Sequence, residues 1–441
     1  MNNRILSLLE TFRTSFWFIP STMVASSSVL ASLFLAYDRS YKDFTPDFLK
    51  FIYKTSPESV RALLTTIAGS MITVTSIAFS ITVVALSLAS SQFGPRLIRN
   101  FMSDKGTQSV LGVFVAIFTY CLLVLQATTS IGTQHFIPGL ATYFALVLAF
   151  AGVGVLIYFI HHVAHSIQAD NVIDKVYCQL KLDIERLFPA QKTQVKDLDN
   201  GPLSYSETRY SQGLKSQQDG YIQAIDIERL IQLATENEIK IKVLVKAGDA
   251  VVKGFTLMKL GIDDAKEQPD EQTLLACIMV GAKRTPIQDP EFAINQLVEI
   301  AVRALSPGIN DPFTAITCTD KLCAILCALT QRTYPPSKHK DQQGTIRVIT
   351  HAFQFSQLAH SAFNQIRQYA EGSVAVTIRL LESLQLIADL VSEQDQREFV
   401  EQQRDMIAQA SERQSLCKQD KQDIEQRLKQ ISESLGKGGR C

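Results

Sequence analysis

The hydrophobic pattern at the start of the chain is dominated by one uncharged stretch, Ala62 to Pro95, which lies between Arg61 and Arg96. As an α-helix, its roughly 34 residues would extend about 50 Å, which exceeds a hydrocarbon core about 30 Å thick. We therefore expect this stretch to cross a membrane. Gly94-Pro95 should end the helix, because proline lacks the backbone donor and disfavours helix before it.

Hydroxyl side chains recur at helical spacing along one side of this predicted helix, while Ile, Val, Leu and Phe occupy the other side. These hydroxyl residues are Thr66, Ser70, Thr73, Ser80, Ser87 and Ser91. Small hydroxyl residues let transmembrane helices approach and hydrogen-bond one another, and the same stripe could line a water-filled path. Close packing is the commoner use, so the sequence favours packing and keeps a pore-lining role for these six residues as the alternative.

Three further apolar segments have the length of membrane spans, at about residues 16–37, 108–131 and 138–161. The last two are separated by a short uncharged turn, which predicts an antiparallel hairpin. Ala145, Ala149 and Gly152 form a small-residue face suited to close helix contact. Together these segments predict a transmembrane domain of four helices over residues 1–165, with both ends on one side of the membrane.

The composition changes near residue 165 from apolar to rich in Gln, Glu, Asp, Lys and Arg, which predicts a soluble α+β domain after the spans. We expect a connecting helix and loop at 166–202, a small β-rich unit at 203–282 and a helical region at 283–441. The chain as a whole is predicted to be a mainly α membrane protein.

The β-rich unit contains GDAVVKGFTL, residues 248–257, which resembles the first hairpin of barrel-sandwich hybrid domains. Those domains include biotinyl and lipoyl carriers, and Met258-Lys259 invites that comparison. In carriers, however, the modified lysine lies on a later hairpin, whereas Lys259 directly continues this strand. We predict a structural or binding module without a bound cofactor.

The helical region begins with two Asp-Pro pairs, Asp289-Pro290 and Asp311-Pro312, each of which places an N-cap residue before a proline at the first helical position. The loop before the second helix, residues 306–310, is short, and the amides that follow could hold a small anion with an arginine nearby. The candidate ligand-binding residues are Arg284, Arg303, Ser306, Asn310 and Asp311. A structural loop with Arg–Asp pairing is the favoured interpretation, because Asp311 as a cap would satisfy the same amides and repel an anion.

A polar and mobile loop is expected at 331–343, followed by helices at 351–369, 372–391, 393–410 and 416–435. The last two predicted helices are strongly polar and Gln-rich. They could form a solvated bundle or a contact between subunits.

The remaining chemistry of the sequence is sparse. Its 43 basic and 43 acidic residues give a formal net charge of zero, so nothing in the charge balance indicates a nucleic-acid partner. Eight cysteines are scattered without a zinc spacing, and no nucleotide-binding glycine motif, nucleophile elbow or His-Glu-x-x-His motif is present. His161, His162 and His165 cluster after the last span, and His161 and His165, one turn apart, could bind a cation or sense pH. No third ligand lies nearby in sequence, so an interfacial role is favoured. We therefore predict no catalytic residue, no metal site, no cofactor and no enzymatic activity.

The orientation rests on a small excess of positive charge. The 38–61 loop carries five Lys or Arg, and five also lie at residues 4, 13, 96, 99 and 105 on the opposite side. Lys175, Lys181 and Arg186 follow the last span and favour a cytoplasmic N-terminus and C-terminal domain. Free cysteines agree with that assignment.

Three long segments carry a resemblance to a known family: SMITVTSIAFSITVVALSLASSQFGPRLIRNF, FIHHVAHSIQ and RTPIQDPEFAINQLVEIAVRALSPGINDPFTA. Together they resemble the bacterial predicted-membrane-protein family known as domain of unknown function 2254. The likeness covers nearly the whole chain in the same order. It implies a bacterial inner-membrane protein with a cytoplasmic C-terminal part, and it leaves the function open.

Two functional hypotheses follow. The first is a homo-oligomeric membrane protein whose second spans pack around an axis and form a path for ions or small solutes, regulated by the cytoplasmic domain. The alternative is a membrane-tethered ligand-binding, sensor or scaffold module without a pore, in which the spans only anchor and dimerise.

Overall fold

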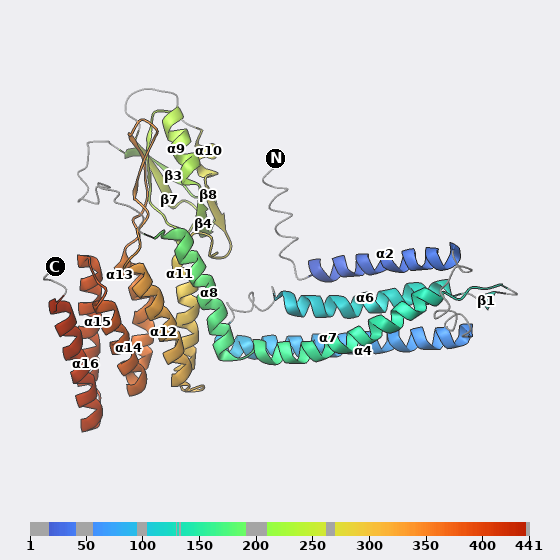
Figure 1. Cartoon of the computed structure of the whole chain (residues 1–441). Coiled ribbons are helices and arrows are strands. Elements are labelled where there is room, and N and C mark those ends of the chain that lie inside the picture. Colours follow the sequence, from blue (N-terminus) through green and yellow to red (C-terminus); the bar gives the residue numbers. More distant parts are fainter. Residues whose placement is uncertain are drawn as a thin grey trace. The chain divides into compact units, whose positions relative to one another are not determined.

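The computed structural model describes residues 17–40, 56–94, 104–128, 130–131, 134–190, 210–261 and 270–437. The chain divides into two compact units, Met1–Val172 and Ile173–Cys441 (Figure 1). Each unit has its own hydrophobic core.

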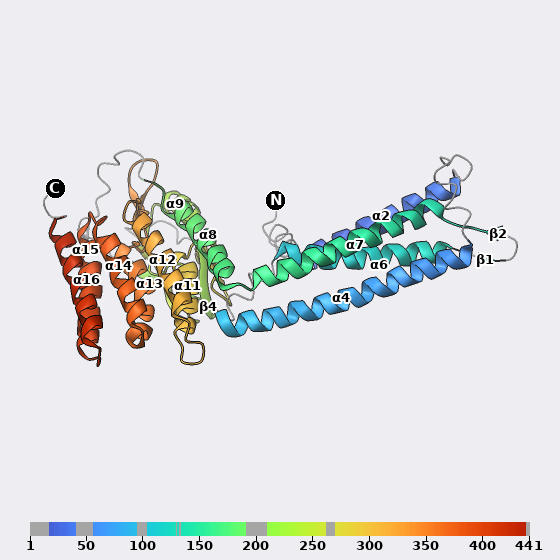
Figure 2. The ribbon, with the colours of Figure 1, turned by 60° about the horizontal axis from the view of Figure 1, so that its bottom comes forward.

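The first unit is a bundle of long helices (Figure 2). These are α2 (Phe18–Ser40), α4 (Pro57–Phe93), α6 (Lys105–Ala127) and α7 (Gly139–Ser166). The short strands β1 (Ser130–Ile131) and β2 (Gln134–His135) form the turn between α6 and α7, so the predicted antiparallel hairpin is present. Helix α6 packs against all three others, and its Phe114 and Tyr120 are fully buried in the core.

Small residues set how closely these helices approach. A Cβ atom at Gly112 of α6 would lie 2.5 Å from the Met23 sulfur of α2, and one at Gly152 of α7 would lie 3.1 Å from Met71 of α4. The predicted small-residue face of α7 therefore does contact neighbouring helices, with Ala145 fully buried beside Gly152. Gly94 ends α4 as expected, with a φ of 109° that favours glycine.

A buried carboxylate joins the end of α2 to the start of α7. Asp38 is 1% exposed, and its two oxygens accept hydrogen bonds from the backbone amides of Leu140 and Ala141, at 3.2 and 3.1 Å. Helix amides at an N-terminus have no intrahelical partner, and the helix dipole favours a negative charge there. Asp38 therefore caps α7 from another helix.

The second unit contains two sheets. The larger has the strand order β3 (Tyr210–Lys215), β7 (Thr256–Gly261), β5 (Lys240–Val243), β10 (Ile346–Ile349) and β9 (Lys338–Lys340). The smaller has the order β6 (Ala250–Val251), β4 (Gly220–Ile225) and β8 (Ile278–Gly281). Among the described strands, β10 runs parallel to β5 and all other pairs are antiparallel.

Helices α9 (Ile227–Glu236) and α10 (Glu271–Leu275) accompany these sheets. The hydrophobic core that these helices form with the sheets is mostly aliphatic, and Leu230, Ile241 and Met258 are fully buried in it.

Several sequence predictions for this region need correction. The predicted loop at 331–343 contains β9, and β10 follows where no strand was expected. The apolar segment at 274–281 forms a strand only from Ile278, because Leu274 and Leu275 belong to α10. The barrel-sandwich-like unit is not confirmed, since the GDAVVKGFTL segment is divided between two sheets, and the larger sheet also includes β10 from about 90 residues later.

The rest of the second unit is helical. Its helices are α8 (Ala169–Leu187, which starts at the end of the first unit), α11 (Pro290–Ala304), α12 (Pro312–Leu329), α13 (Phe355–Tyr369), the 3-10 turn η2 (Ala370–Gly372), α14 (Val374–Ala388), α15 (Gln394–Glu412) and α16 (Lys418–Lys437). Both Asp-Pro pairs start a helix as predicted. Asp311 caps α12 by accepting from Thr314 N at 3.1 Å. Asp289, in contrast, makes no side-chain cap and pairs with Arg284.

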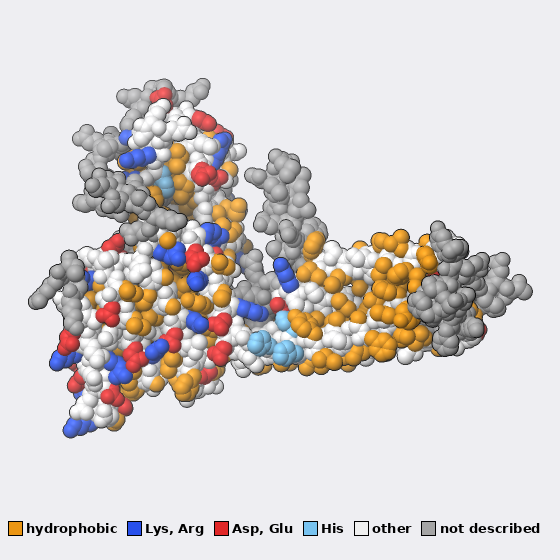
Figure 3. Space-filling view, viewed as in Figure 1, with side chains coloured by type: hydrophobic (Ala, Val, Ile, Leu, Met, Phe, Trp, Pro, Cys, Tyr) orange, Lys and Arg blue, Asp and Glu red, His pale blue; other side chains and the backbone are white. Residues whose placement is uncertain are grey.

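Five described helices are long and apolar enough to cross a membrane: α2, α4, α6, α7 and α12. The predicted count of four spans is therefore not confirmed by length and composition alone. Hydrophobic side chains cover most of the visible face of the first unit, whereas Lys, Arg, Asp and Glu are spread over the second (Figure 3).

Candidate functional site

The six hydroxyl residues of α4 that the sequence singled out lie on the side of the helix that its own bundle leaves exposed. Thr66, Ser70, Thr73, Ser80, Ser87 and Ser91 are each exposed. The opposite side packs in the bundle core through larger apolar residues such as Leu64, Ile67 and Met71. We call the six residues the hydroxyl face of α4.

Hydroxyl groups on this face bond to their own helix. Thr66 donates to the carbonyl of Ala62 at 2.7 Å, Thr73 to that of Gly69 at 2.8 Å and Ser80 to that of Ser76 at 2.9 Å. Such bonds satisfy the donor without water, so the face can contact lipid or protein at low cost. The hydroxyl oxygens still offer lone pairs to any group that approaches.

Apolar side chains are interleaved with the hydroxyl groups. Ile77 is 54% exposed and Val84 67% exposed, and helical geometry places both within this face. Gly69 lies on the same side of the helix with open space beside it. The face therefore combines protruding apolar side chains with open space at a glycine, which is what close helix–helix packing requires.

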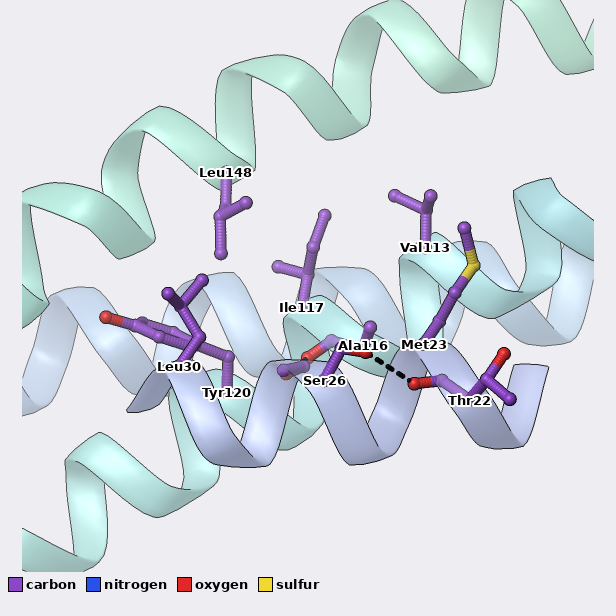
Figure 4. Close-up of a pocket in the computed structure, with 10 residues that line it drawn as sticks. Thr22, Met23, Ser26, Leu30, Val113, Ala116, Ile117, Tyr120 and Leu148 are labelled. Carbon is purple, nitrogen blue, oxygen red and sulfur yellow. Dashed lines mark hydrogen bonds between the residues drawn. The ribbon is translucent and has the colours of Figure 1, made fainter. Parts of the chain in front are cut away.

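A cavity of about 260 Å³ lies among α2, α6 and α7 (Figure 4). Its walls include Met23, Leu30, Ile117 and Leu148, with the hydroxyl groups of Thr22, Ser26 and Ser27 at one side. Ser27 donates to the carbonyl of Ala116 at 2.6 Å, which leaves few polar groups free to orient a ligand. The described lining contains no charged side chain, so this cavity suits an acyl chain or another apolar group.

The histidine cluster at the end of α7 does not act as one site. His162 Nε2 lies 2.5 Å from an Asp104 oxygen at the start of α6. The rings of His161 and His165 instead stack with centroids 6.1 Å apart, and both residues are exposed. A Cβ at Gly106 would lie 2.5 Å from His162 Nε2, so glycine there makes room for the contact between His162 and Asp104.

The candidate ligand residues of the second unit are not all brought together. Ser306, Asn310 and Asp311 lie in the compact loop, where Asn310 has a positive φ of 50°. Arg303 ends α11 beside this loop and lies 3.5 Å from Glu299. Arg284 lies before the other end of α11, a helix of 15 residues that spans about 22 Å.

Arg284 instead belongs to a buried polar group below the sheets. Its Nε and Nη2 atoms donate to one oxygen of Asp289 at 2.9 and 2.6 Å. Burial raises the pKa of Asp289, and the guanidinium of Arg284 opposes that shift. Next to this pair, Lys246 lies 2.7 Å from Glu291. This Arg284–Asp289 pair lies at the start of α11 and is distinct from the Arg–Asp pairing expected at the 306–311 loop.

No group of three or more His, Cys, Asp or Glu side chains with metal-binding geometry occurs in the described ranges. Cys323 and Cys327 of α12 lie close together, with sulfur atoms 4.0 Å apart. Cys323 also donates to the carbonyl of Ser383 and is buried.

Three features of the first unit had no sequence prediction: the Asp38 cap, the Asp104–His162 pair and the apolar cavity. Each depends on residues that are far apart in sequence and meet only in the folded bundle. An acidic residue next to an apolar span was the available signal for Asp38 and Asp104, because such a charge needs a partner at a membrane edge.

Comparison with known proteins places this arrangement in context. A family model described as "Predicted membrane protein (DUF2254)" matches residues 13–386. The chain is 30% identical over 424 residues to Uncharacterized protein Rv1290c of Mycobacterium tuberculosis and, at the same identity, to Uncharacterized protein Mb1321c of Mycobacterium bovis. Each alignment covers 94% of this chain and 79% of the relative. No solved structure matches.

Proposed function

We propose that this chain, which belongs to the DUF2254 family of predicted membrane proteins, self-associates in the bilayer. The contact between copies is the hydroxyl face of α4. The proposal includes a path for ions or small solutes along the associated α4 helices. The single observation that carries it is the exposure of all six hydroxyl residues on one side of α4.

The proposed spans are α2, α4, α6 and α7, and α12 is excluded. Helix α12 packs against α11, α13 and α14 in the second unit. Its Asp320 pairs with Arg379, and its Lys321 lies 2.7 Å from Asp174, so both charges have protein partners. Helix α4 has 37 residues and a length of about 55 Å, which exceeds the hydrocarbon core and lets it project beyond the membrane.

Burial of the hydroxyl face against other copies explains why this side of α4 differs from ordinary lipid-facing surface. A helix that meets only lipid gains nothing from a row of small polar residues, whereas two helices approach more closely across such a row. Around an axis, the same face would present hydroxyl oxygens to a solute. We propose that the second unit lies in the cytoplasm of a bacterium, in agreement with the positive residues of α8.

Disulfide cross-linking in membranes tests the association. In a background without native cysteines, we expect Ser80→Cys to form a covalent dimer on mild oxidation. The matched control is Phe150→Cys on α7, where the side chain is also exposed but lies outside the hydroxyl face. Equal cross-linking at both positions, or none at Ser80→Cys, would contradict the proposal.

Solute flux from vesicles that contain the purified protein tests the path. We expect flux that is lost on Ser80→Leu or Ser87→Leu with little change in protein yield or folding. A bilayer that stays impermeable while Ser80→Cys still cross-links would remove the path and leave self-association standing.

A further inference from the structure

Helices α2 and α7 contact each other where α2 ends and α7 begins. Asp38 accepts hydrogen bonds from the backbone amides of Leu140 and Ala141. About one turn away, the rings of Phe34 and Phe144 lie with their centroids 4.8 Å apart. The residue number falls by four on α2 where it rises by four on α7, so the two helices run antiparallel and in register at this end.

The two helices separate beyond this end, and the cavity of Figure 4 lies in the gap. Leu30 and Leu148 continue the same spacing and line the cavity from opposite helices. Helix α2 supplies four further wall residues, Thr22, Met23, Ser26 and Ser27, whereas α7 supplies no other described residue. One turn beyond Leu148, Gly152 lies against α4 instead, since a Cβ atom there would be 3.1 Å from Met71. The cavity is therefore a fork between α2 and α7, with α6 as its floor.

The polar groups of the fork are already paired within the protein. The described lining has four hydroxyl groups, and each donates to a carbonyl oxygen: Thr22 to Ile19 at 2.8 Å, Ser26 to Thr22 at 2.8 Å, Ser27 to Ala116 at 2.6 Å and Tyr120 to Ala141 at 3.0 Å. A buried water needs about two to four polar partners, and an apolar cavity stays dry without them. The fork therefore favours an apolar occupant over water or a polar ligand.

The fork opens to the outside of its bundle. Thr22 and Ser26 on one rim are exposed, whereas Ile117 on the floor is 2% exposed and Tyr120 is fully buried. Helices α2, α6 and α7 are each long and apolar enough to cross a membrane. Acyl chains rather than water therefore surround the opening. This step rests on the proposed function for one point, the assignment of these helices as spans.

We propose that one acyl chain of a membrane lipid occupies the fork and packs against the floor formed by α6. The cavity volume of about 260 Å³ is below the range of about 300–1,000 Å³ that is usual for pockets holding a whole drug-sized molecule. It suits a single chain, and a described lining without charged side chains leaves the lipid headgroup outside. A flexible chain supplies the dispersion contacts that the walls of the fork do not make with each other.

Photolabelling by a lipid that carries a diazirine on one acyl chain tests the site. The full-length protein is reconstituted in phosphatidylcholine–phosphatidylglycerol vesicles that contain this lipid, irradiated and digested, and the label is located by mass spectrometry. We expect label on the floor residues Ile117 and Tyr120, which lipid around the bundle does not reach because both are buried. Label on Phe150 of α7, which is 71% exposed, is the internal reference for surrounding lipid.

Two valine replacements provide matched variants. Val113 of α6 lines the cavity, whereas Val147 of α7 is 43% exposed and lies outside the lining. Val113→Phe fills part of the fork and should lower the labelling of the floor residues about tenfold relative to the reference. Val147→Phe adds the same volume elsewhere and should leave this ratio unchanged. If Val113→Phe fails to fold, Ser26→Phe at the exposed rim supplies the same readout.

The outcomes keep this proposal apart from the proposed function. Label at Phe150 without label on the floor residues overturns the acyl-chain site and leaves the spans intact, as does an equal change for Val113→Phe and Val147→Phe. Floor residues that stay unlabelled while Ser26→Cys forms a covalent dimer show that a second copy covers the opening, which also overturns the site. Absence of label from all of α2, α6 and α7 contradicts the span assignment itself. Self-association is read separately from Ser80→Cys, because no described residue of α4 lines the cavity.

Discussion

Helix α4 of the first unit and helix α12 of the second are both apolar and long enough to cross a membrane, but their surroundings differ. In the most apolar part of α4, 11% of residues are buried inside the protein, compared with 44% in α12. The apolar surface of α12 is covered by neighbouring helices of its own unit, and much of that of α4 is not. Helix α6, a proposed span at the centre of its bundle, is also 44% buried, so burial alone does not identify a membrane span.

Charge pairing adds a second difference. Helix α12 carries Asp320 and Lys321 in its middle turns, and each has a partner on another helix. Helix α4 has no charged residue after Arg61, which lies near its start and donates to the carbonyl of Thr128. A paired charge in the centre of an apolar helix therefore indicates that the helix packs against other helices of the protein.

The largest effect is expected from placing a charge on each helix. Phe79 of α4 and Ala324 of α12 are both exposed, and Phe79 lies outside the hydroxyl face. Phe79→Asp should impair membrane insertion, because Asp at a span centre costs about 2.5–3.5 kcal/mol. Ala324→Asp should leave insertion unchanged. The measurement is the fraction of protein that resists alkaline extraction from membranes, and an equal loss for both variants would show that α12 also crosses the bilayer.

A smaller effect is expected from truncating a core residue. Leu326 of α12 is fully buried, and Leu326→Ala should lower the free energy of unfolding of the second unit by about 2–5 kcal/mol. Val83 of α4 is exposed, so Val83→Ala should leave that transition within about 0.5 kcal/mol of wild type. Urea unfolding of the full-length protein in micelles, followed by circular dichroism, measures both. Similar midpoints for the two variants would argue against α12 as a core helix.

The smallest effect concerns the ion pairs of α12. Arg379 contacts both Asp320 and Glu382 in partly exposed positions, so Arg379→Ala should cost at most about 1 kcal/mol at neutral pH. Burial alone would raise the pKa of Glu382, but Arg379 and Arg427 outweigh it and the pKa is lowered.

A carboxyl group whose pKa is lowered in the folded state stabilises the fold above its unfolded pKa, about 4.3, and loses that contribution as pH falls through the folded value. The difference in unfolding free energy between wild type and Arg379→Ala should therefore shrink below about pH 4. Unfolding curves measured at pH 3 to 7 test this, with Lys429→Ala, whose side chain is largely exposed, as the control. A difference that stays constant down to the lowest pH would exclude a role for Glu382.

Local patterns in the sequence predicted the helices well. Helix α4 ends at Gly94 as its Gly-Pro signal predicted, and both Asp-Pro pairs begin helices. The strands β9 and β10 were missed, because Lys338–Lys340 is polar and gains its strand conformation only by pairing with β10. In turn, β10 pairs with β5 from about 100 residues earlier, which no local pattern reveals.

The candidate sites were predictable to different degrees. Helical periodicity was enough to place Thr66 and Ser80 on one side of α4, but only the folded bundle shows that this side stays uncovered. Arg284 was grouped with the 306–311 loop because both flank α11. The length of that helix separates them, and Arg284 pairs with Asp289 instead.

The Asp38 cap has a consequence for how the chain is made. Ribosomes release α2 about 100 residues before α7, so the carboxylate that completes the first turn of α7 is already present when that helix emerges. Deletion of α2 would leave the amides of Leu140 and Ala141 without this acceptor. The first turn of α7 is therefore capped only in a chain that already contains α2.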